Sequence, residues 1–365
     1  MIMNVLIYLK RLINRIEYRQ DLRKWKKVIT SNNKSLEHHF KLTKEQKKEV
    51  QDYYKSMIGK KVPLYSHEYF YSRTGYFTKE YVPTNLYHCE LIRKANYYPF
   101  MHAYSDKNMQ DILLEKDHTA HVILKNMNGY YYYEGKPVSE EDAISLCSNL
   151  EKAIIKPTMR SKGKGVQALI VKDGKTNIDD LTIGQLFKQY SKNFIIQRCI
   201  TQHEKMSALN PTSVNTIRVL SYRSDMEVLI IYSVIRIGRK GQVVDNQSAG
   251  GISTTITEDG KLGKVAFGGY NKDNILKTDT GIVLEGYEIP SYDKAIEMVK
   301  RLHLKLPFAN IVGWDIAIQE DGEPVLIEFN TNTGLSQSAF KSGMGKYTER
   351  IIRELWPRRN SKYWV

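Results

Sequence analysis

Apolar residues recur at a helical spacing near the start of the chain. Leu12, Ile13 and Ile16 belong to a series in which apolar positions stand three or four residues apart, which predicts a helix. A charged run follows after it, where Thr43 stands three residues before a glutamine, as in a helix capping box. We therefore expect residues 1–60 to form a basic helical region.

The next segment has no clear period. Residues 61–115 are rich in Tyr, His and Asn and include Pro63, Pro83 and Pro99. We expect an irregular segment of mixed helix and strand. Its aromatic and basic side chains are candidates for an acceptor-binding pocket, although tyrosines more often pack with their hydroxyl groups at the surface.

From residue 116 onward, short apolar runs alternate with turn residues, which is typical of strands. Strands in the majority, with helices between them, predict an α+β fold for residues 116–365. The predicted strands are HVILKN, GYYYYEG, AIIKP, ALIVKDG, NFIIQRCI and the long pair TIRVLSYRSDMEVLIIYSVIRIG, and the predicted helices are LTIGQLFKQY, YDKAIEMVKRLHLKL and YTERIIREL.

The segment GWDIAIQEDGEPVLIEFNTNTG predicts two strands joined by a tight turn. Asp321-Gly322 is a strong signal for a two-residue hairpin loop. That loop places Asp315 opposite Glu328, and Asn330 points the same way because it lies two residues further along the strand. Two carboxylates this close repel unless a cation lies between them, and oxygen ligands of this kind suit Mg²⁺.

A surface hairpin with scattered acids is the alternative interpretation of this segment. Its apolar residues favour a buried position instead. They are Trp314, Ile316, Ile318, Leu326 and Phe329.

Composition narrows the class of protein. The 365 residues are 41% hydrophobic and 26% charged, which is ordinary for a soluble globular protein of two or three packed units. Cys89, Cys147 and Cys199 are far apart and odd in number, which argues against a disulfide framework and fits a reducing, cytoplasmic compartment. We expect neither a membrane-spanning helix nor a signal peptide.

The net charge of +15 implies an anionic partner. Lys10, Arg11, Arg15 and Arg19 give the first helix a basic character that suits contact with the inner face of a membrane, whereas the same helix docked on its own domain is the alternative. Nucleic acid is not expected, because no recognition motif accompanies the charge.

One loop has the composition of a phosphate-binding segment, and a second is rich in turn formers. Lys156 ends an apolar strand, and the flexible loop Arg160–Gly165 follows it. Backbone N–H groups and ammonium charges in such a loop can hold phosphates, although an exposed basic turn is the alternative. Further on, Asp245-Asn246 and Gly250-Gly251 form either a loop that approaches a ligand closely or a plain turn.

Between these loops lie two further candidates. Gln197 ends an apolar strand, and Glu204 stands a few residues beyond, where a carboxylate can accept hydrogen bonds from ribose hydroxyl groups. Arg218 alternates with Ile217 and Val219, so it projects from the polar face of a strand and needs an anion there, either a structural carboxylate or a phosphate.

The order of these elements, rather than any one of them, resembles the ATP-grasp superfamily and most closely its sugar-transfer-associated branch. The resemblance covers about residues 150 to 340, a little over half of the chain. It implies two α+β lobes that enclose ATP, with a hinge near 197–204. The motifs that carry it are IIKP with SKGKGV, QRCITQHE, SVNTIRVLS, VVDNQSAGGI, VGWDIAI and VLIEFNTNTGLS.

The resemblance also implies roles for single residues. Lys156 and Arg218 are the catalytic candidates, and an earlier phosphate-binding lysine is expected at Lys116, with Lys125 as the competitor. The predicted metal ligands are Asp315, Glu328 and Asn330. The predicted nucleotide-binding residues are Lys116, Lys156, Ser161, Lys162, Gly163, Lys164, Gly165, Gln197, Arg198, Cys199, Ile200 and Glu204.

By the same resemblance, we expect an ATP-dependent carboxylate–amine ligase that uses ATP and two Mg²⁺ ions and acts through an acyl-phosphate. The substrates would be an amine and a carboxylate-bearing sugar or glycan precursor of a bacterial surface, capsular polysaccharide. Two alternatives remain open at this point: a kinase that phosphorylates a sugar hydroxyl, with Asp245 or His203 as the base, and a non-catalytic module that binds an anionic glycan or membrane.

Overall fold

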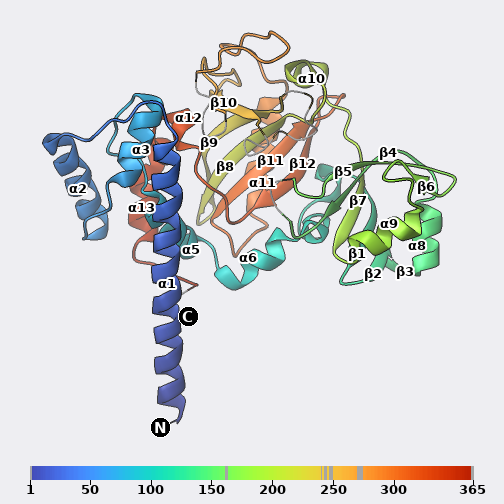
Figure 1. Ribbon diagram of the computed structural model, residues 1–365, viewed down its shortest axis with the longest axis horizontal. Helices are drawn as coiled ribbons and strands as arrows, with labels where there is room; N and C mark the ends of the chain where they lie inside the picture. Colours follow the sequence, from blue (N-terminus) through green and yellow to red (C-terminus); the bar gives the residue numbers. More distant parts are fainter. Residues whose placement is uncertain are drawn as a thin grey trace.

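The structure is a computed structural model that describes residues 2–160, 163–239, 241, 245, 250–268 and 274–362. Helices from both ends of the chain lie together on one side, a five-stranded sheet occupies the centre, and a seven-stranded sheet lies on the other side (Figure 1). The mixed helix-and-sheet fold expected from the sequence is therefore present.

The described residues before 120 form helices joined by loops. This agrees with the helical region predicted for 1–60, whereas mixed helix and strand was predicted for 61–115. In that second segment, all of which is described, no residue belongs to a strand, and Asn96 forms only an isolated bridge with Ala309. The predicted capping box is present, because Thr43 and Gln46 exchange both hydrogen bonds. The elements are α1 Ile2–Lys34, α2 Lys44–Ile58, α3 Tyr65–Thr74, α4 Thr84–Leu86, the π-helical turn η1 Tyr87–Leu91, α5 Ile92–Ala95, α6 Tyr98–Ser105, η2 Lys107–Met109, α7 Gln110–Leu113 and η3 Lys116–His118.

The seven-stranded sheet is antiparallel and has the order β3-β2-β1-β7-β4-β5-β6. Helices α8 and α9 pack on it through the apolar core around Leu124, Ile155 and Phe187 (Figure 1). The elements are β1 Val122–Met127, β2 Tyr130–Tyr133, β3 Lys136–Val138, α8 Glu140–Leu146, β4 Leu150–Pro157, β5 Gln167–Lys172, β6 Lys175–Thr176, α9 Ile183–Tyr190 and β7 Phe194–Arg198.

The five-stranded sheet is also antiparallel, with the order β10-β9-β8-β11-β12. One face packs on α11, because residues such as Ile217, Val219 and Trp314 point into that core. Arg218 lies between two of these residues and faces the other way, as its alternation predicts. The elements are α10 Glu204–Leu209, β8 Thr216–Ser224, β9 Glu227–Ile237, β10 Ile252–Ile256, α11 Tyr292–His303, β11 Ile311–Ile318, β12 Pro324–Asn330, α12 Gln337–Phe340, η5 Gly345–Tyr347 and α13 Thr348–Leu355.

The β11–β12 hairpin has the predicted partners but not the predicted loop. Asp315 pairs with Glu328, whereas the pairing shifts by one residue at Ile316, which pairs with Leu326. The loop is longer than two residues: Gln319 N–H bonds the carbonyl of Glu323 at 2.9 Å and Gly322 takes a positive φ of 83°. A three-residue loop with glycine in this conformation is a common hairpin type, and a β-bulge at Ile327 compensates for its extra residue.

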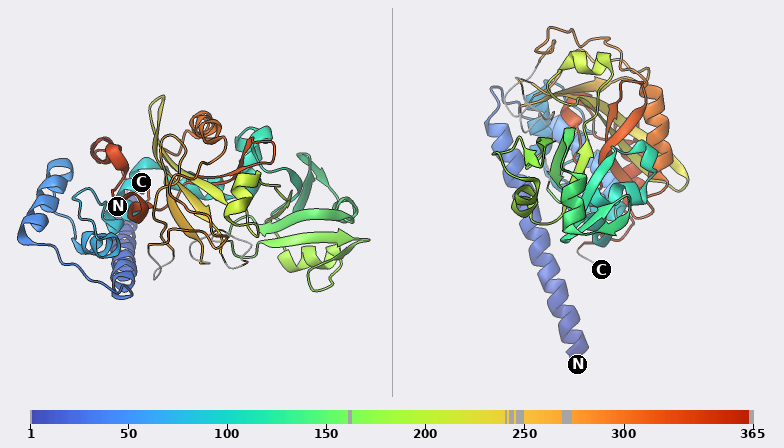
Figure 2. Two further views of the ribbon diagram at one scale, coloured as in Figure 1. Left: turned by 90° about the horizontal axis from the view of Figure 1, so that it is seen from above. Right: turned by 90° about the vertical axis from the view of Figure 1, so that its right-hand side faces the viewer.

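Helix α1 is docked along only part of its length. From Tyr18 onward it is tied to the body: Tyr18 donates to Glu90 at 2.6 Å, Asp21 pairs with Lys362 at 2.7 Å, and Trp25 stacks on His88. The preceding turns project away from the rest of the molecule (Figure 2). The docked-helix alternative therefore describes the second half of α1 but not the first.

Candidate functional site

A cavity of about 150 Å³ lies between the two sheets, where β4 and β7 of one face β8, β9, β11 and β12 of the other. Its described lining combines three kinds of side chain: basic groups, carboxylates and an apolar wall. None of the described residues that line it is Ser, Cys or His. The lining residues are Lys107, Ala120, Ile154, Lys156, Pro157, Arg160, Gly163, Val166, Gln197, Arg198, Ile200, Val214, Thr216, Arg236, Asp245, Asp315, Ile327 and Glu328.

Two lysines approach the cavity from the side of the seven-stranded sheet. Lys156 is buried near the end of β4, and burial lowers its pKa to about 8; repulsion by Lys107 adds to this, while Glu328 opposes it. Lys107 lies 3.2 Å from Glu328 and also donates to the carbonyl of Arg160 at 3.1 Å. The Lys107 contact ties the start of the loop after β4 to the carboxylates of the other lobe.

The opposite wall is built by cross-strand neighbours. Arg218 on β8 pairs with Asp315 on β11, which pairs with Glu328 on β12, so the three side chains share one face of the sheet. Arg218 binds both carboxylate oxygens of Asp315, with Nη2 2.6 Å from Oδ2. Arg236 on β9 adds a further contact to Asp315 at 3.3 Å. Two guanidinium groups therefore neutralise one buried carboxylate.

Glu328 and Asn330 lie side by side on β12. The amide nitrogen of Asn330 is 3.3 Å from Oε1 of Glu328, so the two side chains point the same way, as predicted. Burial raises the pKa of Glu328, but the charges of Lys107, Lys156 and Arg218 outweigh it and lower the pKa to about 2. Glu328 is therefore ionised at neutral pH.

These residues fit a magnesium site that is completed by a substrate. Two carboxylates and one amide supply only oxygen ligands, which Mg²⁺ prefers, and phosphates commonly provide the rest. In this structure Lys107 contacts Glu328 and Arg218 contacts Asp315. A divalent cation bound between the two carboxylates would supply positive charge in the same way. Among the residues that the structure describes, no group of three or more His, Cys, Asp or Glu side chains is placed to hold a metal ion.

Asp245 lies at the same end of the cavity. It accepts a hydrogen bond from Thr216 of β8 and is almost fully buried. Burial raises its pKa to about 6, and Asp315 also raises it, although Arg236, Arg218 and the bond from Thr216 act in the opposite direction. Its sequence neighbour Asn246 lies outside the described residues.

The strand that ends at Arg198 contributes a further part of the cavity lining. Gln197, Arg198 and Ile200 line it together with apolar residues of both sheets. Gln197 is buried and donates to the carbonyl of Ala120 at 3.1 Å, while the N–H of Cys199 bonds the carbonyl of Lys152. The adenine-binding role that the resemblance implies for residues 197–200 stays a prediction.

The loop after β4 is described only in part. Gly163 lines the cavity, Lys164 is exposed, and the predicted Ser161 and Lys162 lie outside the described residues. Gly165 has a φ of 76°, and a Cβ atom there would lie 2.9 Å from the ring of Pro157. Glycine is therefore required at the point where the loop folds back onto the strand end.

Three other predicted residues lie elsewhere. Lys116 is exposed in η3, and Glu204 is exposed at the first position of α10; neither lines the cavity. Lys125 is buried in β1, where it pairs with Asp111 and donates to the carbonyl of Asn108 at 2.9 Å. The roles of these residues stay predictions, and the second lysine that reaches the cavity is Lys107.

Sequence reasoning did not find Lys107 or Arg236. Lys107 lies in the segment without periodicity, where nothing marks it among several basic residues. Arg236 carries a usable signal, because it alternates with Ile235 and Ile237 on a strand, as Arg218 does between Ile217 and Val219.

Comparison with solved structures gives similar ATP-grasp folds at low identity. The ATP-grasp ligase PsnB in complex with its minimal precursor has a TM-score of 0.41 at 13% identity over 71% of this chain and 62% of its own. Biotin carboxylase from Campylobacter jejuni has a TM-score of 0.43 at 12% identity, over 72% of this chain and 48% of its own. D-alanine–D-alanine ligase from Bacillus anthracis has a TM-score of 0.38 at 14% identity, over 69% of this chain and 67% of its own. The chain thus spans about half to two thirds of their lengths, and a search of curated proteins gave no match.

Two antiparallel sheets around a cavity of lysines, arginines and carboxylates define this chain as an ATP-grasp protein. The family model for sugar-transfer associated ATP-grasp proteins matches residues 87–352, and the chain belongs to that family.

Proposed function

We propose that the protein is an ATP-dependent carboxylate–amine ligase that works through an acyl-phosphate. The observation that carries the proposal is the row Arg218–Asp315–Glu328, whose two carboxylates line the cavity between the sheets together with Lys156 and Lys107. This arrangement supplies charge on both sides of a polyphosphate. The described lining offers no serine, cysteine or histidine nucleophile, so positioning and charge neutralisation are the means of catalysis that it favours.

In the proposed reaction, a carboxylate oxygen of one substrate attacks the γ-phosphorus of ATP, and the bond to ADP breaks. The amine then attacks the acyl carbon, phosphate leaves, and the nitrogen loses a proton to give an amide. Asp315, Glu328 and Asn330 would hold two Mg²⁺ ions, which neutralise phosphate charge when bound. Lys156 and Lys107 bind the phosphates, and Arg218 and Arg236 stabilise the charge on the transferred group.

The acceptor in this proposal is a carboxylate-bearing sugar or a glycan precursor of a surface polysaccharide. The family's association with sugar transfer supports it. ATP consumption measured over a panel of uronic acids and amines tests it. We expect ADP and free phosphate to form in equal amounts and only when a carboxylate and an amine are both present. Phosphate release that is independent of the amine would contradict the ligase assignment.

A sugar kinase is the second candidate, and Asp245 is the observation that favours it. This carboxylate is buried beside Thr216 at the phosphate end of the cavity, where a general base would accept the proton of a sugar hydroxyl. His203 lies elsewhere, at the start of α10, where its ring accepts a hydrogen bond from the N–H of Lys205. ADP formation with a phosphorylated sugar and no free phosphate would identify the kinase.

Location at the inner face of a membrane is part of the proposal. No helix in the described part of the chain is long and apolar enough to cross a bilayer. The projecting half of α1 nevertheless exposes Tyr8, Leu9, Leu12, Ile13 and Ile16, each more than 40% accessible. Basic residues alternate with them, and each can contribute about 1 kcal/mol at an anionic surface. They are Lys10, Arg11, Arg15 and Arg19.

The variant Ile13→Ser/Ile16→Ser is therefore expected to lose at least tenfold in affinity for vesicles that contain anionic lipid, because it removes apolar contact and leaves the charge unchanged. Co-sedimentation of the full chain with anionic and zwitterionic vesicles measures this. Ile112→Ser/Leu146→Ser removes exposed apolar residues from the body of the protein and serves as the control. Equal vesicle binding by the wild type and the α1 variant would contradict membrane contact through α1.

A further inference from the structure

Three aromatic side chains form an exposed cluster beside α6. Tyr97, Phe100 and Phe308 are 41%, 39% and 39% exposed. Phe100 stacks on Phe308 with the ring centroids 3.9 Å apart, and the ring of Tyr97 lies 5.9 Å from that of Phe308. Aromatic rings that contact one another and still face the solvent are typical of a surface that another molecule covers.

The backbone that carries the cluster is fixed by the body of the protein. The N–H of Tyr97 bonds the carbonyl of Phe308 at 2.8 Å, which joins the start of α6 to the segment after α11. The preceding Asn96 is buried and donates to the carbonyls of Ile311 and Thr331 at 2.7 and 2.6 Å. The exposure of the three rings is therefore a property of the fold and not of a loose loop.

A cavity of about 300 Å³ adjoins the cluster and carries positive charge. Lys94 and Arg359 are its charged residues, and none of the described residues that line it is Asp or Glu. Arg359 is exposed and forms no ion pair with a described residue. The lining residues are Lys94, Ala95, Asn96, Tyr97, Pro307, Phe308, Asn310, Arg359 and Ser361.

The carboxylates nearest to this surface are already paired. Glu115 lies 3.1 Å from Arg301 and 3.0 Å from Lys305, which stands three residues before Phe308. Glu90, whose charge acts on Lys94, is buried and accepts a hydrogen bond from Tyr18 of α1 at 2.6 Å. The surface beside the aromatic cluster is therefore basic, and its charge complements an anionic partner.

The cluster also lies next to the point where α1 leaves the body. Ser361 donates to the carbonyls of Arg93 and Asn96 at 2.7 and 2.8 Å, and the next residue, Lys362, pairs with Asp21 of α1 at 2.7 Å. In Figure 1, α6 lies along the lower edge of the body, on the side from which the first turns of α1 project. One flat surface can therefore contact both.

We infer that this face of the body rests on a bilayer that contains anionic phospholipid. Tyr97, Phe100 and Phe308 enter the boundary between headgroups and acyl chains, and the cavity of Lys94 and Arg359 takes a headgroup phosphate. A bilayer fits this face because aromatic and basic side chains occur together on it, as they do on the projecting half of α1.

This inference rests on the proposed membrane location and adds a contact that does not involve α1. A helix alone would tether the protein, whereas a second contact through the body fixes its orientation on the membrane. The ligase proposal does not depend on either contact, so vesicle binding tests the inference separately from turnover.

Fluorescence quenching by brominated lipid tests the contact, because bromine quenches an indole ring only at close range. The full-length variant Phe308→Trp is mixed with phosphatidylglycerol vesicles that have brominated acyl chains. Tyr130→Trp, at an exposed position on β2 of the other sheet, is the control, and both variants keep the four native tryptophans as the same background. We expect the added tryptophan of Phe308→Trp to be quenched about twofold or more relative to that of the control.

Two further variants test the chemistry of the face. Phe100→Gln/Phe308→Gln should weaken binding to phosphatidylglycerol vesicles about tenfold, since it removes apolar contact without changing charge. Arg359→Met should weaken it about fivefold and leave binding to zwitterionic vesicles unchanged. Tyr130→Ser/Ile170→Ser removes exposed apolar residues from the seven-stranded sheet and should bind as the wild type does. Circular dichroism checks that each variant is folded.

Equal quenching in Phe308→Trp and Tyr130→Trp, or wild-type vesicle binding by the phenylalanine variant, would overturn the inference. A dimer in sedimentation velocity that Phe100→Gln/Phe308→Gln loses, with vesicle binding unchanged, would assign the face to a second copy of the chain instead. Quenching in Phe308→Trp together with wild-type binding by Ile13→Ser/Ile16→Ser would support this face and contradict membrane contact through α1.

Discussion

Glu328→Gln is expected to lower the turnover of ATP by about 10²- to 10³-fold while the chain stays folded. The substitution keeps the shape of the side chain but removes the charge that Lys107, Lys156 and a magnesium ion would share. Burial raises the pKa of Glu328, but the charges of Lys107, Lys156 and Arg218 outweigh it and hold the pKa at about 2, so the wild type presents a carboxylate at neutral pH. Steady-state kinetics with saturating Mg²⁺ measure the loss, and circular dichroism measures the fold.

Glu323→Gln is the matched control for that experiment. Glu323 lies on the same hairpin but at its tip, where it pairs with Lys294 and is about half exposed. Removing its charge should leave turnover within a factor of two or so, because an exposed pair contributes at most about 1 kcal/mol. Near-normal turnover in Glu328→Gln, or an equal loss in both variants, would remove Glu328 from the proposed metal site.

Arg218→Met should be nearly inactive and also less stable, by about 2–4 kcal/mol in urea unfolding. The reason is that Asp315 is buried and takes two hydrogen bonds from Arg218, so the substitution leaves a buried carboxylate with only its weaker contact to Arg236. Removing one partner of a buried ion pair typically costs about 3–5 kcal/mol, and Arg236 offsets part of this.

The double variant Arg218→Met/Asp315→Leu separates the two effects. Apolar residues in place of both partners should restore most of the lost stability, because neither charge is then left unpaired. Activity should stay lost, since both the phosphate-binding arginine and a metal ligand are absent. Recovery of turnover together with stability would show that the pair is structural and has no part in the reaction.

The sequence was sufficient for the part of the site that depends on local alternation. Arg218 and the Asp315–Glu328 pair could be placed because period-two patterns fix which side chains share a face. The pair was nevertheless predicted from a two-residue loop that is wrong. The loop has one residue more, and the bulge at Ile327 restores the register. A bulge has no clear signal in the sequence. The extra loop residue and the bulge cancel each other in the register, so neither could be predicted from the pairing of Asp315 with Glu328.

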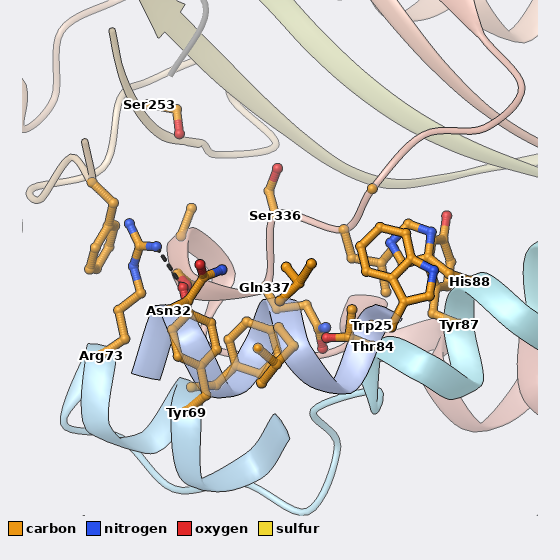
Figure 3. Close-up of a pocket in the computed structure, with 18 residues that line it drawn as sticks. Trp25, Asn32, Tyr69, Arg73, Thr84, Tyr87, His88, Ser253, Ser336 and Gln337 are labelled. Carbon is orange, nitrogen blue, oxygen red and sulfur yellow. Dashed lines mark hydrogen bonds between the residues drawn. The ribbon is translucent and has the colours of Figure 1, made fainter. Parts of the chain in front are cut away.

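The remainder of the site depends on contacts between residues far apart in the chain. Lys107 reaches Glu328 across 221 positions only because η2 packs against β1 and β7 of the seven-stranded sheet, within reach of β12. Nothing in the irregular, aromatic-rich segment around it marks that lysine. The same holds for a cavity of about 260 Å³ whose walls combine α1 and α3 with residues after β12 (Figure 3).

The fate of the carboxylate oxygen tests the account most directly. A uronic acid labelled with ¹⁸O in its carboxylate is turned over with ATP and an amine, and the released phosphate is analysed by mass spectrometry. If an acyl-phosphate forms, the carboxylate oxygen that attacked phosphorus leaves with it, so each phosphate should carry one ¹⁸O atom derived from the acid. Released phosphate without the label, or ADP with a phosphorylated sugar hydroxyl in place of free phosphate, would contradict carboxylate–amine ligation.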